Sequence, residues 1–140
     1  MSLIPSGITS VARDLAGALL PLSLRELERE VDERLAKVPT RLNEFGYDPF
    51  GFSPASVRPS AVAAALLYRR YFRVETHDIE RVPAGRVLLT ANHAGQLPFD
   101  GMMISSAMLL EAEPPRGVRA MAEYWVPQIP WVSVWMARGG

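Results

Sequence analysis

The sequence predicts an α/β protein, in which N-terminal amphipathic helices precede the start of a mostly parallel sheet built from βαβ units. Two observations lead to this fold class. Apolar residues recur at helical spacing in the first half of the chain, and from residue 71 onward short strand-like apolar runs flank one helical run. We therefore expect two regions, a helical region at 1–70 with an aromatic and Pro-rich connector, and the first part of an α/β domain at 71–140.

The first region begins with two predicted helices. Residues 8–20 place apolar side chains on one helical face and end at Pro21. A second amphipathic helix is expected over 24–37, because Ser23 and Glu26 form a capping box and leucine and valine recur at helical spacing after it. The two helices are expected to form a hairpin that either lies on a membrane or packs on the body of the protein.

A connector and a third helix complete this region. Residues 40–60 hold several prolines and glycines with aromatic residues between them, which is typical of a connector whose aromatics dock on another part of the protein. The next helix is expected over 59–72. Arg69 and Arg70 near its end either complement the helix dipole or meet lipid phosphates, and the sequence leaves both interpretations open.

The second region is expected to alternate strands and helices. The run "RVLLTAN" is continuously apolar, as in a strand buried on both faces, and "DGMMISSAMLLEAE" is expected to be a helix with Asp100 as its N-cap. Further strands are predicted over 71–77 and 117–123, and residues 127–139 are expected to form either a short helix or another strand.

The composition excludes several classes of function. Fifteen basic residues balance fifteen acidic ones, so no net field favours nucleic acid as a partner. The chain has no cysteine, which excludes disulfides and thiolate chemistry. The longest apolar run, 61–68, is far too short to span a bilayer, and the N-terminus does not read as a signal peptide. Because the chain ends in Gly-Gly after an apolar segment, we expect it to be the front part of a longer protein.

His93 and Asp100 form the candidate site. His93 follows the predicted buried strand, and Gly95 and Pro98 allow the loop to double back and bring the Asp100 carboxylate to the imidazole. A carboxylate on one ring nitrogen would leave the other to accept a proton from a substrate hydroxyl. Alternatively, Asp100 only caps its helix and His93 bonds to loop carbonyls. Two histidines sixteen positions apart give no metal site.

The residues around this pair resemble a known sequence motif. The stretch "ANHAGQLPFDGMMI", preceded by "YFRVETHDIERVPAGRVLLT", resembles the first catalytic block of the glycerolipid acyltransferase family, the 1-acylglycerol-3-phosphate acyltransferases and their relatives. The spacing of six residues between histidine and aspartate is that of one branch, with Ala94 where the branch has serine. The matching positions are Asn92, His93, Gly95, Leu97, Pro98, Asp100 and Gly101.

This resemblance implies a function. His93 would be the general base on the acceptor hydroxyl, Asp100 would orient it, and Asn92, Gly95 and Gly101 would help to bind substrate. The acyl donor would be acyl-CoA or acyl-carrier protein, the acceptor a lysophospholipid or other glycerolipid, and no cofactor or metal would be needed. The protein would be cytoplasmic and peripheral at the inner face of the membrane. The later family blocks, including the one that binds acceptor phosphate, are absent from this chain.

Other functions stay open at this level. An esterase or thioesterase would need a nucleophile, and no Gly-x-Ser-x-Gly elbow is present. A non-catalytic module that binds membrane or protein through residues 1–70 is the alternative of another class. His77, Arg73 and Arg116 are expected to be surface residues, although either arginine would suit a phosphate. The aromatic residues at the end of the chain either pack in the core or meet lipid; they are Tyr124, Trp125, Trp131 and Trp135.

Overall fold

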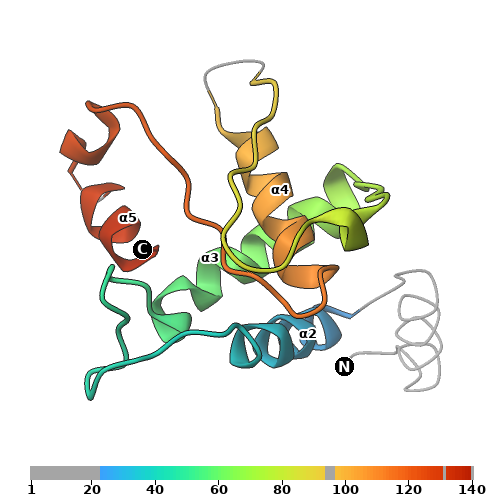
Figure 1. The fold of residues 1–140 in the computed structure, drawn as a ribbon, viewed down its shortest axis with the longest axis horizontal. Coiled ribbons are helices and arrows are strands. Elements are labelled where there is room, and N and C mark those ends of the chain that lie inside the picture. Colours follow the sequence, from blue (N-terminus) through green and yellow to red (C-terminus); the bar gives the residue numbers. More distant parts are fainter. Residues whose placement is uncertain (1–22, 94–96, 131, 140) are drawn as a thin grey trace, which may run out of the picture.

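The computed structural model describes residues 23–93, 97–130 and 132–139, and this part of the chain is helical (Figure 1). Four α-helices are connected by short 3-10 or π-helical turns and by irregular segments. Their bounds are α2 Leu24–Ala36, α3 Pro54–Leu66, η1 Leu67–Tyr71, η2 Ile79–Arg81, α4 Phe99–Leu110, η3 Val126–Gln128 and α5 Val132–Gly139. The helix predicted over 8–20, and with it the predicted hairpin, lies outside the described residues.

The predicted helix over 24–37 is confirmed as α2, and so is its capping box. The Ser23 hydroxyl accepts a hydrogen bond from the Glu26 backbone N–H at 3.2 Å, and the Glu26 carboxylate accepts one from the Ser23 N–H at 2.6 Å. Three apolar residues at helical spacing, Leu27, Val31 and Leu35, are buried, whereas Leu24 remains half exposed. The amphipathic pattern therefore identified both the helix and most of its buried face.

The connector that follows α2 docks through one aromatic residue. Phe52 is buried in the core, whereas Phe45 and Phe50 are 75% and 70% exposed, so docking of all the aromatics is not observed. The side chain of Asp48 is buried and accepts hydrogen bonds from the backbone N–H groups of Phe50 and Phe52 at 2.8 and 2.9 Å. It also pairs with Arg119, whose guanidinium lies 4.4 Å from the Phe50 ring centroid.

The third helix begins five residues earlier than predicted. Pro54 stands in its first turn, where a missing N–H costs nothing, and Pro59, expected to start the helix, lies inside it. The helix continues directly into the π-helical turn η1, which ends at Tyr71. Gly51, just before α3, has a φ of +93° and contacts the Ala137 carbonyl of α5 so closely that a Cβ there would clash.

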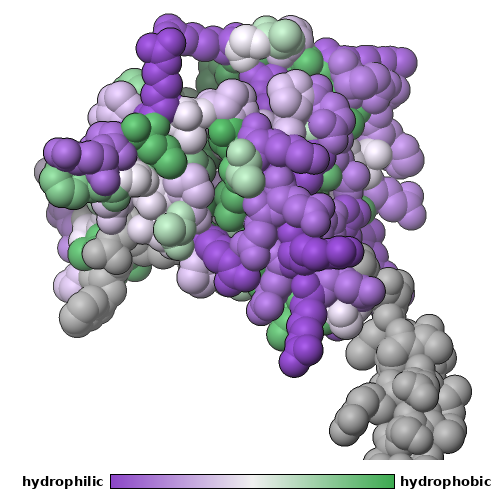
Figure 2. All heavy atoms as spheres, turned by 90° about the horizontal axis from the view of Figure 1, so that it is seen from below, coloured by the Kyte–Doolittle hydropathy of each residue, from purple (hydrophilic) through white to green (hydrophobic). Residues whose placement is uncertain are grey.

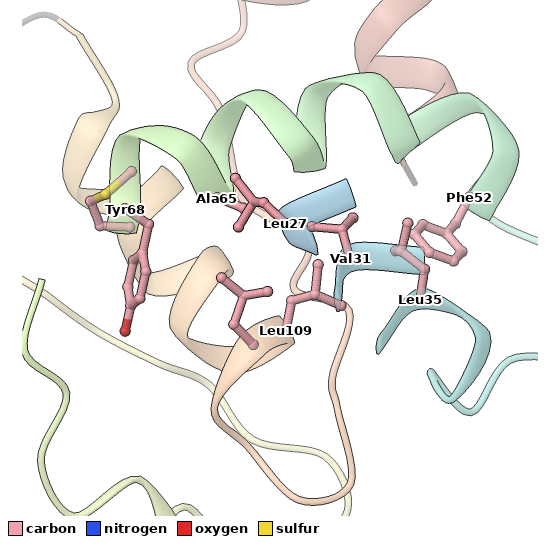
Figure 3. Close-up of a cluster of buried hydrophobic side chains, with 9 residues drawn as sticks. Leu27, Val31, Leu35, Phe52, Ala65, Tyr68 and Leu109 are labelled. Atoms are coloured by element: carbon pink, nitrogen blue, oxygen red, sulfur yellow. The ribbon is translucent and has the colours of Figure 1, made fainter. Parts of the chain in front are cut away.

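The core lies where α2, α3 and α4 meet (Figure 3). Each helix contributes buried apolar side chains, and Tyr68 of η1 is among the most deeply buried residues. Because α4 packs on both α2 and α3, the core draws on residues from both sides of the predicted boundary at residue 70. The cluster is made of Leu27, Val31, Leu35, Phe52, Ala65, Tyr68, Met103, Leu109 and Leu110.

Arginines join the three helices at the edge of this core. Arg69 donates to Glu30 of α2 at 2.8 Å and to Glu111, just after α4, at 2.6 Å. Burial lowers the pKa of Arg69, but the two carboxylates outweigh it and hold that pKa above its ordinary value. Arg34 of α2 donates to the Leu109 carbonyl at 2.8 Å, at the C-terminal end of α4, where a cation suits the helix dipole.

The predicted α/β fold is wrong for the described part of the chain, which contains no strand and no sheet. Strands exist through hydrogen bonds to a neighbouring strand, and among the described residues the three predicted strands form no such ladder. Within 71–77, Arg73 has a φ of +47°, which is incompatible with a strand, and the Val74 N–H returns to the Tyr68 carbonyl at 3.0 Å.

The run "RVLLTAN" illustrates the error. Its residues lie alongside α4 in Figure 1, but Leu88 is 74% exposed, and Val87 and Leu89 are only partly covered. Residues 117–123 are similarly open, with Met121 exposed to 90%. A continuous apolar run predicts neighbours on both faces, but the described fold supplies only α4 beside residues 89–90.

The last segment resolves a choice that the sequence left open. Residues 132–139 form the helix α5, which contacts α3, and η3 precedes it. None of the helices in the described ranges is long and apolar enough to cross a membrane. The face seen from below in Figure 2, where α2 lies, is mostly hydrophilic, as the charged outer face of that helix predicts.

Candidate active site

The structure brings His93 and Asp100 together. His93 ends the extended segment that runs beside α4, and Asp100 lies in the first turn of α4. The imidazole Nδ1 is 2.7 Å from Oδ2 and 2.9 Å from Oδ1 of the carboxylate. The expectation that the Asp100 carboxylate reaches the imidazole is therefore confirmed as geometry.

Asp100 is not the N-cap that the sequence predicted. Pro98 occupies the cap position and makes no side-chain cap hydrogen bond, so Asp100 falls within the helix. Its Oδ1 accepts the backbone N–H of Gly101 at 2.8 Å. This first-turn position places the carboxylate near the positive end of the helix dipole, where a negative charge is favourable.

This contact determines which ring nitrogen is available. A carboxylate accepts hydrogen bonds, so Nδ1 is the donor in this contact, and in the neutral imidazole that pairs in this way Nε2 is the nitrogen with the lone pair. The His93 side chain is 55% exposed and that of Asp100 is 32% exposed. The arrangement is thus an oriented imidazole with an accessible proton-accepting nitrogen, which is the arrangement of a general base.

The other predicted site residues contribute less to this geometry. Asn92 is exposed beside His93, and Gly101 lies in the first turn of α4, where a Cβ would meet nothing within 4 Å. Space alone therefore does not demand glycine at position 101. Gly95 lies outside the described residues. The alternative in which His93 only bonds to loop carbonyls is not what the described contacts show, because its partner is Asp100.

A groove further along α4, which neither His93 nor Asp100 lines, was not anticipated from the sequence. It has a volume of about 420 Å³ and lies between α4, the segment around His77 and the end of the extended run. Met103, Ile104, Ala107 and Met108 of α4 form one wall, and Leu89 and Thr90 lie close to it. These four residues recur at positions i, i+1, i+4 and i+5 of a helix, and this spacing was the sequence signal for the groove wall. Such a pattern more often marks a face that packs in the core.

The remaining polar candidates have ordinary surroundings. His77 is a surface residue, as predicted, with its side chain 79% exposed and its Nε2 3.7 Å from a Glu75 carboxylate oxygen. Arg116 donates to the Pro83 carbonyl at 2.8 Å and to that of Gly85, so it holds a loop. Within the described ranges, no three histidine or carboxylate side chains gather closely enough to hold a metal ion.

The site thus belongs to the class of histidine–carboxylate pairs placed at a helix N-terminus. Among curated proteins, the chain is similar to an uncharacterized protein of Mycobacterium tuberculosis, with 41% identity over 90 residues, which are 64% of this chain and 24% of that protein. An uncharacterized protein of Mycobacterium leprae is 38% identical over 100 residues, 71% of this chain and 26% of its own length. The chain therefore spans about a quarter of the length of these relatives.

No family model matches the chain, and no solved structure matches it.

Proposed function

We propose that the protein containing this chain is an acyltransferase that moves a fatty acyl group from a thioester to a hydroxyl of a lysophospholipid or related glycerolipid. The observation that carries the proposal is the hydrogen bond between His93 Nδ1 and the Asp100 carboxylate, which leaves Nε2 as an accessible base. The resemblance of residues 92–101 to an acyltransferase block supports the choice of substrate. The donor would be acyl-CoA or acyl-carrier protein, and the reaction would need no cofactor.

The chemistry follows from an oriented imidazole. Nε2 of His93 takes the proton of the acceptor hydroxyl while the hydroxyl oxygen attacks the thioester carbonyl carbon, which forms the new C–O bond. Asp100 stabilises the resulting imidazolium through Nδ1. The C–S bond then breaks, and the imidazolium returns the proton to the departing thiolate. The ester and the free thiol are the products, and His93 is neutral again.

The proposal includes a location. We propose that the protein is cytoplasmic and acts at the inner face of the membrane, where a lysophospholipid acceptor resides. Because this chain spans about a quarter of its relatives, the complete activity is proposed for the longer protein, with His93 and Asp100 as its base and positioning residue.

The first test is acyl transfer with the His93→Ala variant. Both the 140-residue chain and a version extended to the length of the relatives are mixed with labelled long-chain acyl-CoA, lysophosphatidic acid and vesicles. We expect the extended protein to form acylated lipid, and His93→Ala to lower the rate by roughly 10²–10⁴-fold, the usual contribution of a general base. Asp100→Asn should lower kcat and shift the pH–rate profile, because it removes the charge that stabilises the imidazolium.

His77→Ala is the matched control, since it removes the other histidine of the chain, whose side chain is 79% exposed and lies near Glu75. It should keep the wild-type rate. Equal rates for His93→Ala and wild type, or an extended protein that acylates none of several acceptors, would contradict the proposal. Release of free fatty acid without transfer would instead identify a thioesterase.

A further inference from the structure

Three aromatic rings gather at the surface next to the candidate site. The rings of Tyr71 and Phe72, at the end of η1, meet edge to face with centroids 4.8 Å apart. Phe72 in turn lies 5.4 Å from Phe99, the first residue of α4 and the immediate neighbour of Asp100. The cluster therefore connects two segments that are distant in sequence, and one of them carries the carboxylate of the site.

These rings are not part of the core. Tyr71 is 74% exposed, Phe72 40% and Phe99 39%, and Leu97, two residues before Phe99, is 62% exposed. The three rings contact one another in series, and contiguous apolar patches that face solvent mark interaction surfaces. We call Tyr71, Phe72, Leu97 and Phe99 the aromatic patch.

The charge beside the aromatic patch indicates its partner. Arg73 follows Phe72 directly, is exposed, and pairs with no carboxylate in the described part of the chain. Its φ of +47° turns the backbone just after the aromatic residues. Of the two arginines in η1, Arg69 is already engaged with Glu30 and Glu111, and Arg70 is partly buried, whereas Arg73 is exposed. An unpaired cation beside exposed aromatic rings matches the boundary of a bilayer, where rings enter the headgroup layer and a cation meets lipid phosphate.

We propose that the aromatic patch, together with Arg73, docks on the surface of a bilayer that contains anionic phospholipids. Docking by this patch would bring His93 and Asp100 to the headgroup layer, because Phe99 is adjacent to Asp100 in α4. The biological role of this docking rests on the proposed function, since docking would bring the acyltransferase site to its lipid acceptor. It assigns membrane contact to residues 71–73 and 97–99, rather than to the charged face of α2.

The test measures vesicle binding without any acyl donor, so its result does not depend on catalysis. The 140-residue chain is mixed with vesicles of phosphatidylcholine, with or without phosphatidylglycerol, and bound protein is separated by flotation. We expect binding to the anionic vesicles, weakened by about tenfold or more in a Phe72→Ser, Phe99→Ser double variant, since two rings no longer leave water. Arg73→Gln should weaken binding only to the anionic vesicles, by about fivefold.

The matched control is Phe45→Ser, which removes an even more exposed phenylalanine ring, from the connector. It should bind as wild type does, and unchanged helical circular dichroism should show that every variant is folded. Undiminished binding of the double variant would overturn the proposal, as would absence of binding by the wild-type chain. Concentration-dependent dimerisation that the double variant abolishes, without vesicle binding, would also overturn it by identifying a second copy as the partner. His93→Ala should bind normally, which separates a failure of docking from a failure of the proposed chemistry.

Discussion

At the scale of single residues, Asp48 determines the shape of the connector between α2 and α3. Burial raises the pKa of its carboxyl, but hydrogen bonds from the Phe50 and Phe52 N–H groups and the charge of Arg119 outweigh this effect and lower the pKa below its ordinary 3.8. Three donors from different positions converge on one buried carboxylate. The Asp48 carboxylate therefore links the backbone of the connector to the Arg119 side chain.

The lowered pKa of Asp48 predicts how the stability of the protein depends on pH. A carboxyl with a lowered pKa in the folded state contributes stability above the unfolded pKa, and this contribution is lost as pH falls through the folded value. Asp48→Asn should therefore lower the free energy of unfolding by about 1.5–3 kcal/mol at pH 7. The difference from wild type should shrink below about pH 4, as denaturant unfolding at each pH would measure.

Asp32 provides the comparison for that experiment. It pairs with Arg58 through Oδ1 at 2.5 Å and Oδ2 at 2.9 Å, but the pair is largely exposed. Its pKa is also lowered, chiefly by the hydrogen bond from Arg58. Water and salt screen such a pair, so Asp32→Asn should cost less than Asp48→Asn at pH 7. An equal cost for both variants would show that burial of Asp48 contributes nothing.

At the scale of elements, α2 and α4 begin in different ways. The N-terminus of α2 is closed by the reciprocal capping box of Ser23 and Glu26. The N-terminus of α4 has no side-chain cap, because Pro98 holds that position, and the carboxylate of its first turn is directed to His93 instead. The N-terminus of α2 is therefore stabilised by its own side chains. The N-terminus of α4 instead directs its Asp100 carboxylate to His93.

The capping box gives the prediction at this scale. Ser23→Ala removes the acceptor for the Glu26 N–H and should destabilise the protein by about 1 kcal/mol, measured by denaturant unfolding. Ser23→Asp keeps an acceptor at the cap and should retain most of the stability. If Ser23→Ala unfolds at the wild-type denaturant concentration, the cap seen here does not contribute to folding.

At the scale of the whole molecule, the helices of the two halves form one core. Leu27 of α2 is 1% exposed and belongs to the same cluster as Tyr68 and Leu109 (Figure 3). Leu24, one turn earlier on the same helix, is 51% exposed. The two leucines therefore share a helix and differ in burial.

That difference defines the prediction for the core. Leu27→Ala should lower the free energy of unfolding by about 2–5 kcal/mol, because it leaves a cavity between three helices. Leu24→Ala should change it by less than about 1 kcal/mol, since the side chain is already half in water. Thermal unfolding of the two variants beside wild type measures both. Similar losses for the two leucines would contradict the three-helix core.

Local signals explain which parts of the fold were predictable. The capping box and the leucine spacing identified α2, and the run after Asp100 identified α4, because a helix satisfies its hydrogen bonds within its own segment. The contact between His93 and Asp100 was one of two alternatives in the sequence, since a short stretch with glycine and proline permits the contact without requiring it. The start of α3 was misplaced because two prolines, Pro54 and Pro59, compete as helix-start signals and only the first one starts the helix.

The sequence by itself determined the helices α2 and α4 and the exclusion of thiol chemistry, because each of these depends on nearby residues or on composition alone. It left the pairing of His93 with Asp100 as one of two alternatives, and the structure decided between them. Only the tertiary structure decided that "RVLLTAN" forms no strand in the described part of the chain, that Arg69 meets Glu30 and Glu111, and that Phe72 meets Phe99. These facts depend on which distant segments lie beside each other. An apolar run is equally compatible with a buried strand and an exposed extended segment until its neighbours are known.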